Sequence, residues 1–308
     1  MKKAVVLMNM WASRNKKEFK QFLSNMFFDE KILPIKNRII RKIVGFFIVR
    51  KILKKNWKNF EKIWWKSPMH EITESLVKKL QRLLPKHFIT YSMRYTEPSS
   101  QNIINELKLK NIKDVILFPL YPHNSITTNI SSFEDFENKS GSSFSIKKID
   151  YFYENTLFNE AIIEKIIEKV SWNFEEYEFI FSAHSLPKRV IEMWDSYEKH
   201  INNHIKILQK LFKKHKMNFN SISLAYQSMV WKEKWLEPSL DTILKKKNWK
   251  KVVIYPITFV IDNSETVYEL DIEYRELAIG YWIKEYILTE CVNDSDTFCE
   301  MLAWEIKK

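Results

Sequence analysis

The sequence predicts an α/β protein with two Rossmann-like halves, each built on a parallel four-stranded sheet. Eight short apolar runs rich in β-branched residues recur along the 308 residues, and longer helical patterns separate them. Strands that alternate with helices are typical of parallel sheets covered on both faces. The runs divide into four and four near residue 150, without a Gly/Ser- or Pro-rich linker. We therefore expect one unit over 1–306, with closely packed halves 1–150 and 151–306.

The first half contains four predicted strands and an unusual basic helix. The strands cover 4–10, 88–93, 114–120 and 143–149, and a helical pattern covers Ser99–Lys110. Residues 36–55, KNRIIRKIVGFFIVRKILKK, mix bulky apolar residues with Lys and Arg. From periodicity alone, this amphipathic helix either packs its apolar stripe on the core or lies on an anionic membrane.

The second half repeats the alternation of strands and helices. Its predicted strands cover 178–184, 221–227, 251–257 and 285–291, and its helical patterns cover 157–170, 188–214 and 264–278. Ligands bind at the C-terminal ends of strands in open α/β sheets. The chemistry is therefore expected just after each apolar run.

Composition excludes several classes of function. The net charge is +12, but the lysines are spread along the chain and no nucleic-acid module motif appears, so we expect no nucleic-acid partner. Two cysteines make no disulfide framework, which fits a cytoplasmic protein. The first ten residues resemble a strand more than a signal peptide, and no apolar stretch approaches the ~20 residues that span a bilayer.

Polar and aromatic residues gather at the predicted strand ends. We expect these ends to converge on one cleft with His184 and Glu265 at its centre. A lone histidine there is more often structural than catalytic. The strand-end residues are Asn9 and Met10, Arg94 and Tyr95, residues 119–125 with Tyr121, His184, residues 226–228, and residues 262–266 with Glu265.

Glu265 begins an acidic row. Glu265, Glu269 and Glu273 are spaced i, i+4, i+8, which places them on one helix face without an intervening lysine. A solvated surface helix more usually interleaves charges of both signs. A carboxylate row can accept protons or pass a divalent cation inward, and the alternative is an ordinary acidic face.

From about Lys3 to Ile306, the sequence contains motifs that resemble those of the ferrochelatase family in their order and approximate spacing. The segments that carry the resemblance are LMNM, LPIKN, KSP, MRY, LFPLYPHNSITT, FSAHSLP, LAYQS, KWLEP and PITFVIDNSETVYELDIEY. The resemblance implies a porphyrin cleft between the two halves, Fe2+ as substrate and no organic cofactor. It implies a catalytic pair, His184 and Glu265, with His184 acting as metal ligand or proton acceptor. The implied metal and acidic path comprises His184, Glu265, Glu269 and Glu273.

The resemblance also implies how the substrate binds. The predicted porphyrin contacts are Met10, Ser67, Arg94, Tyr95 and Tyr121. Residues 36–55 fall where the family has a hydrophobic lip, which favours a peripheral contact with the inner membrane face. Cys291 and Cys299 are too few to ligate an iron–sulfur cluster, so none is expected.

The function implied is insertion of Fe2+ into protoporphyrin IX, the last step of haem synthesis. Coproporphyrin is an alternative substrate, and chelation of another metal into another tetrapyrrole is a second alternative. The alternative from another class is a non-catalytic porphyrin- or haem-binding protein. It is motivated by the tryptophans at family glycine positions and by Asn263. Asn263 stands where many members have a histidine, and its amide cannot take a proton at neutral pH.

Glycine is the largest departure from the family pattern. The chain has three glycines and eleven tryptophans, whereas ordinary usage of about 7% would give roughly 20 glycines. We hypothesise that the source reads UGA as glycine and that these codons were translated as tryptophan. The tryptophans at family glycine positions are Trp11, Trp64, Trp65, Trp194, Trp231, Trp249 and Trp282.

Overall fold

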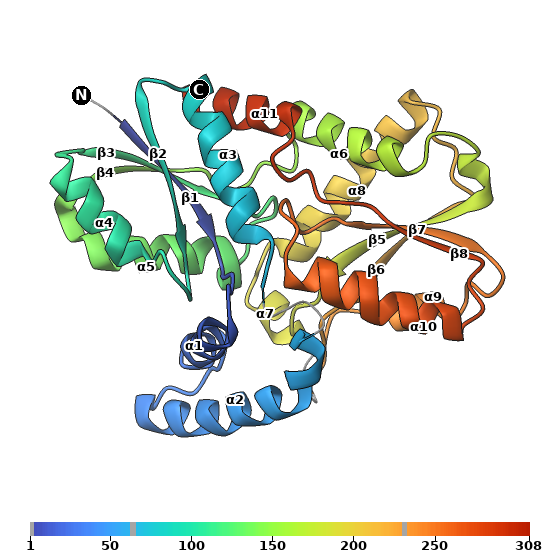
Figure 1. Cartoon of the computed structure of the whole chain (residues 1–308), viewed down its shortest axis with the longest axis horizontal. Helices are drawn as coiled ribbons and strands as arrows, with labels where there is room; N and C mark the ends of the chain where they lie inside the picture. Colours follow the sequence, from blue (N-terminus) through green and yellow to red (C-terminus); the bar gives the residue numbers. More distant parts are fainter. Residues whose placement is uncertain (1–2, 62–65, 230–232) are drawn as a thin grey trace. The chain divides into compact units, whose positions relative to one another are not determined.

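The computed structural model describes residues 3–61, 66–229 and 233–308. The chain forms two compact units, each with its own sheet (Figure 1). Unit 1 comprises 1–120, 125–150 and 306–308, and unit 2 comprises 121–124 and 151–305. The predicted α/β class with two parallel four-stranded sheets is confirmed. The predicted cleft between the halves stays a prediction.

The sheet of unit 1 has the strand order β2-β1-β3-β4, and every neighbouring pair is parallel. Its strands are β1 (Lys3–Asn9), β2 (His87–Met93), β3 (Asp114–Pro119) and β4 (Ser145–Lys148). The central strand β1 is buried from Ala4 onward, because a parallel strand covered on both faces is apolar throughout.

The helices of unit 1 include the basic helix that the sequence indicated. They are α1 (Lys16–Phe27), α2 (Arg38–Glu61), α3 (Met69–Leu83), α4 (Ser100–Leu109) and α5 (Ser131–Ser140), with a π-helix η1 (Ile126–Ile130) and a 3-10 turn η2 (Gly141–Ser143). Helix α2 packs on α1, where a Cβ at Gly45 would lie 2.9 Å from the carbonyl oxygen of Phe27. Glycine therefore permits the close approach of the two segments.

The sheet of unit 2 has the corresponding order β6-β5-β7-β8, also parallel throughout. Its strands are β5 (Tyr177–His184), β6 (Ser221–Gln227), β7 (Lys251–Pro256) and β8 (Glu285–Leu288). The helical segments are α6 (Thr156–Lys169), η3 (Phe174–Glu176), α7 (Lys188–Glu192), α8 (Tyr197–Lys214), α9 (Leu240–Leu244), the π-helix η4 (Glu265–Glu273), α10 (Tyr274–Gly280) and α11 (Asp296–Lys307).

Two helix predictions are wrong in detail. The helix expected over 188–214 is interrupted between α7 and α8, because Trp194 adopts a left-handed φ of 64° that no α-helix continues through. The α-helix expected over 264–278 is a π-helix up to Glu273 and α-helical only from Tyr274. Apolar periodicity does not separate these two helix types, since both present one face to the core.

The two units share a local sequence as well as a topology. In each unit a π-helix follows the third strand of the sheet in chain order. The π-helix of unit 1 is entered through Asn124-Ser125-Ile126-Thr127 and that of unit 2 through Asn263-Ser264-Glu265-Thr266. Thus Ile126 stands in unit 1 where the acidic Glu265 stands in unit 2.

Candidate active site

His184 ends β5 with its imidazole oriented by the chain itself. Its Nδ1 lies 2.7 Å from the carbonyl oxygen of Ser185. A carbonyl only accepts, so Nδ1 carries a proton, and in the neutral imidazole Nε2 therefore has the lone pair. That Nε2 lies 3.7 Å from Oε2 of Glu265, with 35% of the His184 side chain exposed. The imidazole can therefore accept a proton or ligate a metal through Nε2.

Ser228 joins Glu265 to Glu269. Its backbone N–H donates to Oε1 of Glu269 at 2.8 Å, and its Oγ lies 2.5 Å from Oε2 of Glu269 and 3.1 Å from Oε2 of Glu265. The backbone of Ser228 is left-handed, with φ of 64°, which turns both groups toward the π-helix. One serine therefore holds two carboxylates of the acidic row together.

The two carboxylates are not alike. Burial and the neighbouring Glu265 carboxylate raise the pKa of Glu269 to about 8. The raised pKa favours the protonated form of Glu269, which can donate to the Ser228 Oγ while the single Ser228 hydroxyl proton is donated to Glu265. Glu273, one step further along the π-helix, is exposed. The row runs from the side of His184 to solvent.

Asn263 acts as a helix cap. Its Oδ1 accepts from the Glu265 N–H at 2.8 Å, and its Nδ2 donates to the carbonyl oxygen of Ile261 at 3.1 Å. The side chain is buried and both of its polar ends are used. Asn263 therefore fixes the start of the π-helix and leaves proton transfer to other groups.

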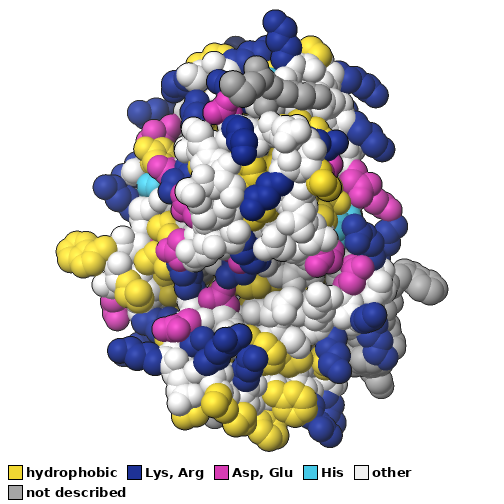
Figure 2. Space-filling model, turned by 90° about the vertical axis from the view of Figure 1, so that its left-hand side faces the viewer, with side chains coloured by type: hydrophobic (Ala, Val, Ile, Leu, Met, Phe, Trp, Pro, Cys, Tyr) yellow, Lys and Arg dark blue, Asp and Glu magenta, His cyan; other side chains and the backbone are white. Residues whose placement is uncertain are grey.

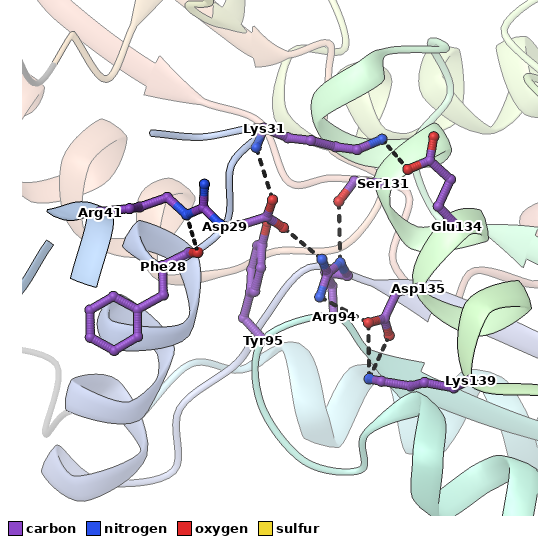
Figure 3. A network of polar contacts seen from close by, with 10 residues as sticks. All are labelled: Phe28, Asp29, Lys31, Arg41, Arg94, Tyr95, Ser131, Glu134, Asp135 and Lys139. Carbon is purple, nitrogen blue, oxygen red and sulfur yellow. Dashed lines mark hydrogen bonds and ion pairs between the residues drawn. The ribbon is translucent and has the colours of Figure 1, made fainter. Parts of the chain in front are cut away.

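Arg94, a predicted porphyrin contact, lies in an internal ionic network of unit 1 (Figure 3). Its guanidinium is 2.6 Å from Asp29 and 3.1 Å from Asp135, and its Nε donates to the Ser131 hydroxyl at 3.2 Å. All three guanidinium nitrogens are therefore engaged with protein groups.

The other predicted porphyrin contacts differ in accessibility. Tyr95 is buried, and its hydroxyl donates to Asp29 at 2.9 Å in the same network (Figure 3). Ser67 is buried before α3 and accepts from the Met69 N–H at 3.4 Å. Met10 and Tyr121 are partly exposed, in unit 1 and unit 2 respectively. Of the five, these two present accessible surface together with the partly exposed Arg94.

The predicted metal path does not form a preassembled metal centre. Within residues 3–61, 66–229 and 233–308, three or more His, Cys, Asp or Glu side chains nowhere gather as metal ligands. His184 and Glu265 form a pair, and Glu269 is turned toward Ser228.

Sequence reasoning placed Ser228 among the strand-end residues 226–228 but gave it no role of its own. Its link to Glu265 and Glu269 bridges 37 and 41 positions of the chain. Pairing of β6 with β5 and of β5 with β7 creates that proximity, so the strand-end position was the available signal and the two partners were not.

Comparisons with known proteins support one family. A ferrochelatase family profile matches residues 2–308. The chain is 44% identical to the ferrochelatase of a Nitratiruptor species over 97% of both chains. It is 44% identical to that of Wolinella succinogenes, covering 98% of this chain and 97% of the relative. It is 40% identical to that of a Helicobacter pylori strain, covering 99% of this chain and 93% of the relative.

Solved structures share the fold at low identity. The cobalt complex of the sirohydrochlorin chelatase SirB from Bacillus subtilis subspecies spizizenii aligns with a TM-score of 0.61 at 8% identity, over 100% of this chain and 94% of that chain. CbiX, the terminal enzyme of sirohaem biosynthesis in denitrifying bacteria, aligns with a TM-score of 0.55 at 10% identity, over 100% and 98%. The two-half chelatase fold is thereby shown.

Proposed function

The chain belongs to the ferrochelatase family, and we propose that His184 and Glu265 carry its iron-insertion step. Ferrochelatases insert ferrous iron into a porphyrin, so the chain is an enzyme, a lyase of haem synthesis with Fe2+ as substrate. The non-catalytic alternative is therefore not supported. The family name shared by the relatives favours protoporphyrin IX over coproporphyrin as the substrate.

The distance between His184 and Glu265 carries this proposal. Two pyrrole protons must leave the porphyrin as Fe2+ enters. The Nε2 lone pair of His184 faces the Glu265 carboxylate at 3.7 Å, and both side chains are partly exposed. A neutral imidazole and a carboxylate at this separation can take up a pyrrole proton or ligate the incoming metal. Planar porphyrin hides its nitrogen lone pairs in the ring plane, so a buckled substrate is expected.

The acidic row provides a way out for the proton. When Glu269 is protonated, its carboxyl group donates a hydrogen bond to Ser228 Oγ, and the Ser228 hydroxyl donates one to Glu265. When Glu265 gains a proton, the same three groups reverse direction: Glu265 donates to Ser228, and Ser228 donates to Glu269. Glu269 must first release its own proton toward solvent, in the direction of the exposed Glu273. Each proton that enters the row is matched by one that leaves it.

We also propose that α2 is the membrane-contacting element. The face of α2 opposite its contact with α1 exposes five large apolar side chains, and Lys and Arg flank them along that edge of the molecule (Figure 2). The exposed side chains are Ile39, Ile40, Ile43, Phe46 and Phe47. Among the described residues, no helix has both the length and the apolar character needed to cross a membrane. The proposed contact is therefore peripheral, on an anionic membrane face.

Anaerobic insertion of Fe2+ into protoporphyrin IX, followed by porphyrin fluorescence, tests the catalytic pair. His184→Ala and Glu265→Gln should each lower kcat by about 10²–10⁴-fold, because each removes a group that accepts a pyrrole proton during iron insertion. Porphyrin binding should persist in both variants. His215→Ala is the matched control, since that histidine pairs with Glu160 at 2.9 Å, at the C-terminal end of α8. Undiminished turnover in His184→Ala would remove the proposed role.

A further inference from the structure

The backbone of His184 is held on both sides by side chains. Its backbone N–H donates to Oγ1 of Thr258 at 3.1 Å, and its carbonyl oxygen accepts from the Tyr197 hydroxyl at 2.7 Å. Tyr197 thus donates to the carbonyl on one side of His184, and Thr258 accepts from the N–H on the other side. The two side chains together fix the backbone on both sides of the imidazole.

Thr258 serves the His184 N–H because the ladder between β5 and β7 stops short of His184. On the β7 side, the last ladder bond runs from the Ile257 N–H to the Ser182 carbonyl at 3.0 Å. The His184 N–H lies beyond that bond and needs another acceptor, since a buried unpaired N–H is costly. Thr258, one residue past Ile257, supplies a side-chain oxygen in place of a strand carbonyl.

Tyr197 has little freedom to move. It is buried at the first residue of α8, and its own N–H donates to Oδ1 of Asp195 at 2.9 Å. Its ring meets that of His123 edge-on, with the centroids 6.2 Å apart and the planes at 88°. His123 is itself fixed by a 2.9 Å hydrogen bond to His204, two turns along α8. The Tyr197 hydroxyl, which donates to the His184 carbonyl, is thus held in place by the core of unit 2.

We propose that Tyr197 and Thr258 are positioning residues that set the direction of the His184 imidazole. The inference rests on the proposed role of His184. Rotation of the 183–185 backbone would displace both the Ser185 carbonyl that holds Nδ1 and the Nε2 that faces Glu265. A displacement of about 1 Å at a reacting group costs on the order of 10²-fold in rate. Neither hydroxyl needs to contact the substrate for this effect.

Isosteric variants of the full chain test the proposal. Tyr197→Phe and Thr258→Val each remove one of the two hydrogen bonds to the His184 backbone while keeping side-chain volume, and kcat should fall about 10- to 100-fold with KM for porphyrin unchanged. Thr258→Ser keeps the oxygen and should recover most of the rate. Tyr177→Phe is the matched control, because it loses a 3.2 Å bond to Glu285 at the opposite end of β5.

Amide hydrogen exchange at His184 gives a readout that does not need turnover. Its amide should exchange faster in Tyr197→Phe and Thr258→Val, and as in the unmodified chain in Thr258→Ser and Tyr177→Phe. An unchanged kcat in Tyr197→Phe, with unchanged exchange, would overturn the proposal; so would an equal rate loss in Tyr177→Phe. If His184→Ala also turned over normally, the proposed catalytic pair would fail as well. If His184→Ala alone were inactive, only the positioning role would be lost.

Discussion

At the scale of single residues, three tryptophans occupy backbone conformations that favour glycine. Trp194, Trp249 and Trp282 have φ of 64°, 61° and 58°. Trp282 follows the last residues of α10, and the Ile283 N–H returns to the Ala278 carbonyl at 3.0 Å, the pattern of a helix end closed by glycine. The exposed fractions of the three indoles are 96%, 62% and 64%. Steric strain without burial is what a glycine replaced by tryptophan would show.

The other four tryptophans at family glycine positions add no support from backbone geometry. Trp11 is not among the described residues with a positive φ, and its indole stacks on Phe22 at 3.8 Å and 8° and packs against the cluster of α1 and α2. Trp64, Trp65 and Trp231 lie outside the described residues. The misread-codon hypothesis is therefore supported at three of the seven positions by geometry that the sequence did not reveal.

Restoring glycine should stabilise the chain at these turns. Trp194→Gly and Trp282→Gly should each raise the free energy of unfolding by about 1 kcal/mol, because a left-handed non-glycine residue costs roughly that much. Urea denaturation measures the change. Trp304→Gly is the control: this exposed tryptophan lies inside α11, where glycine lowers helix stability by about 1 kcal/mol relative to alanine. Destabilisation in all three variants would contradict the assignment.

The buried histidine pair of unit 2 should make the fold acid-sensitive. Burial lowers the pKa of His204 to about 3, below the 6.5 of an unperturbed histidine. Between these values the unfolded chain binds the extra proton and the folded chain does not, so stability falls as pH decreases from about 6.5 toward 3.

Urea unfolding at pH 7 and pH 5 measures that dependence. His204→Gln should reduce the loss between the two pH values by up to about 1.4 kcal/mol per pH unit. His215→Gln should leave the loss in place. An identical pH dependence in His204→Gln and the unmodified chain would show that His204 is not the sensitive group.

At the scale of elements, the acidic row depends on a π-helix that the sequence did not predict. Glu265, Glu269 and Glu273 follow a four-residue spacing that fits an α-helix and also the wider π-helix, whose hydrogen bonds span five residues. The choice is made by local contacts: Asn263 caps the Glu265 N–H, and Ser228 holds Glu269. These partners come from outside the helix, so periodicity within it carries no information about them.

Helix α2 gives a prediction at the same scale. The double variant Phe46→Ser/Phe47→Ser should weaken co-sedimentation with anionic vesicles by about tenfold or more, since each large apolar side chain contributes about 1.5–3 kcal/mol when fully buried. The matched control is Leu83→Ser/Leu109→Ser, which removes two exposed apolar side chains at the ends of α3 and α4. Equal binding of both double variants, or binding to neutral vesicles alone, would contradict a membrane role for α2.

At the scale of the whole molecule, two units of equal topology carry unequal chemistry. Both place a π-helix after the third strand, but unit 1 has Ile126 where unit 2 has Glu265. Histidine at the end of the first strand of the sheet is likewise found in unit 2, as His184, whereas β1 ends at Asn9. Our proposal therefore places proton handling in unit 2, whereas unit 1 contains the Arg94 network and α2.

The whole chain also provides the decisive comparison for the tryptophans. A version with glycine at all seven suspected positions should insert iron faster than the sequence as written, because glycine permits the close approaches and left-handed turns that the family pattern uses. His184→Ala in the restored version should abolish the gain. UGG codons at Trp194, Trp249 and Trp282 would contradict misreading, whatever the rates.

The sequence by itself determined the fold class, the number of strands and the family. Apolar runs typical of strands buried on both faces, and the order of the family motifs, are local properties. Both can be read from the sequence without knowing any tertiary contact. Tertiary structure decided which partners each site residue has: it engaged Arg94 with Asp29 and Asp135, joined Ser228 to the acidic row, and placed the Tyr197 and Thr258 hydroxyls on the His184 backbone. These interactions join positions 13 to 74 residues apart along the chain. Their partners are chosen by strand order and helix packing, which no local pattern encodes.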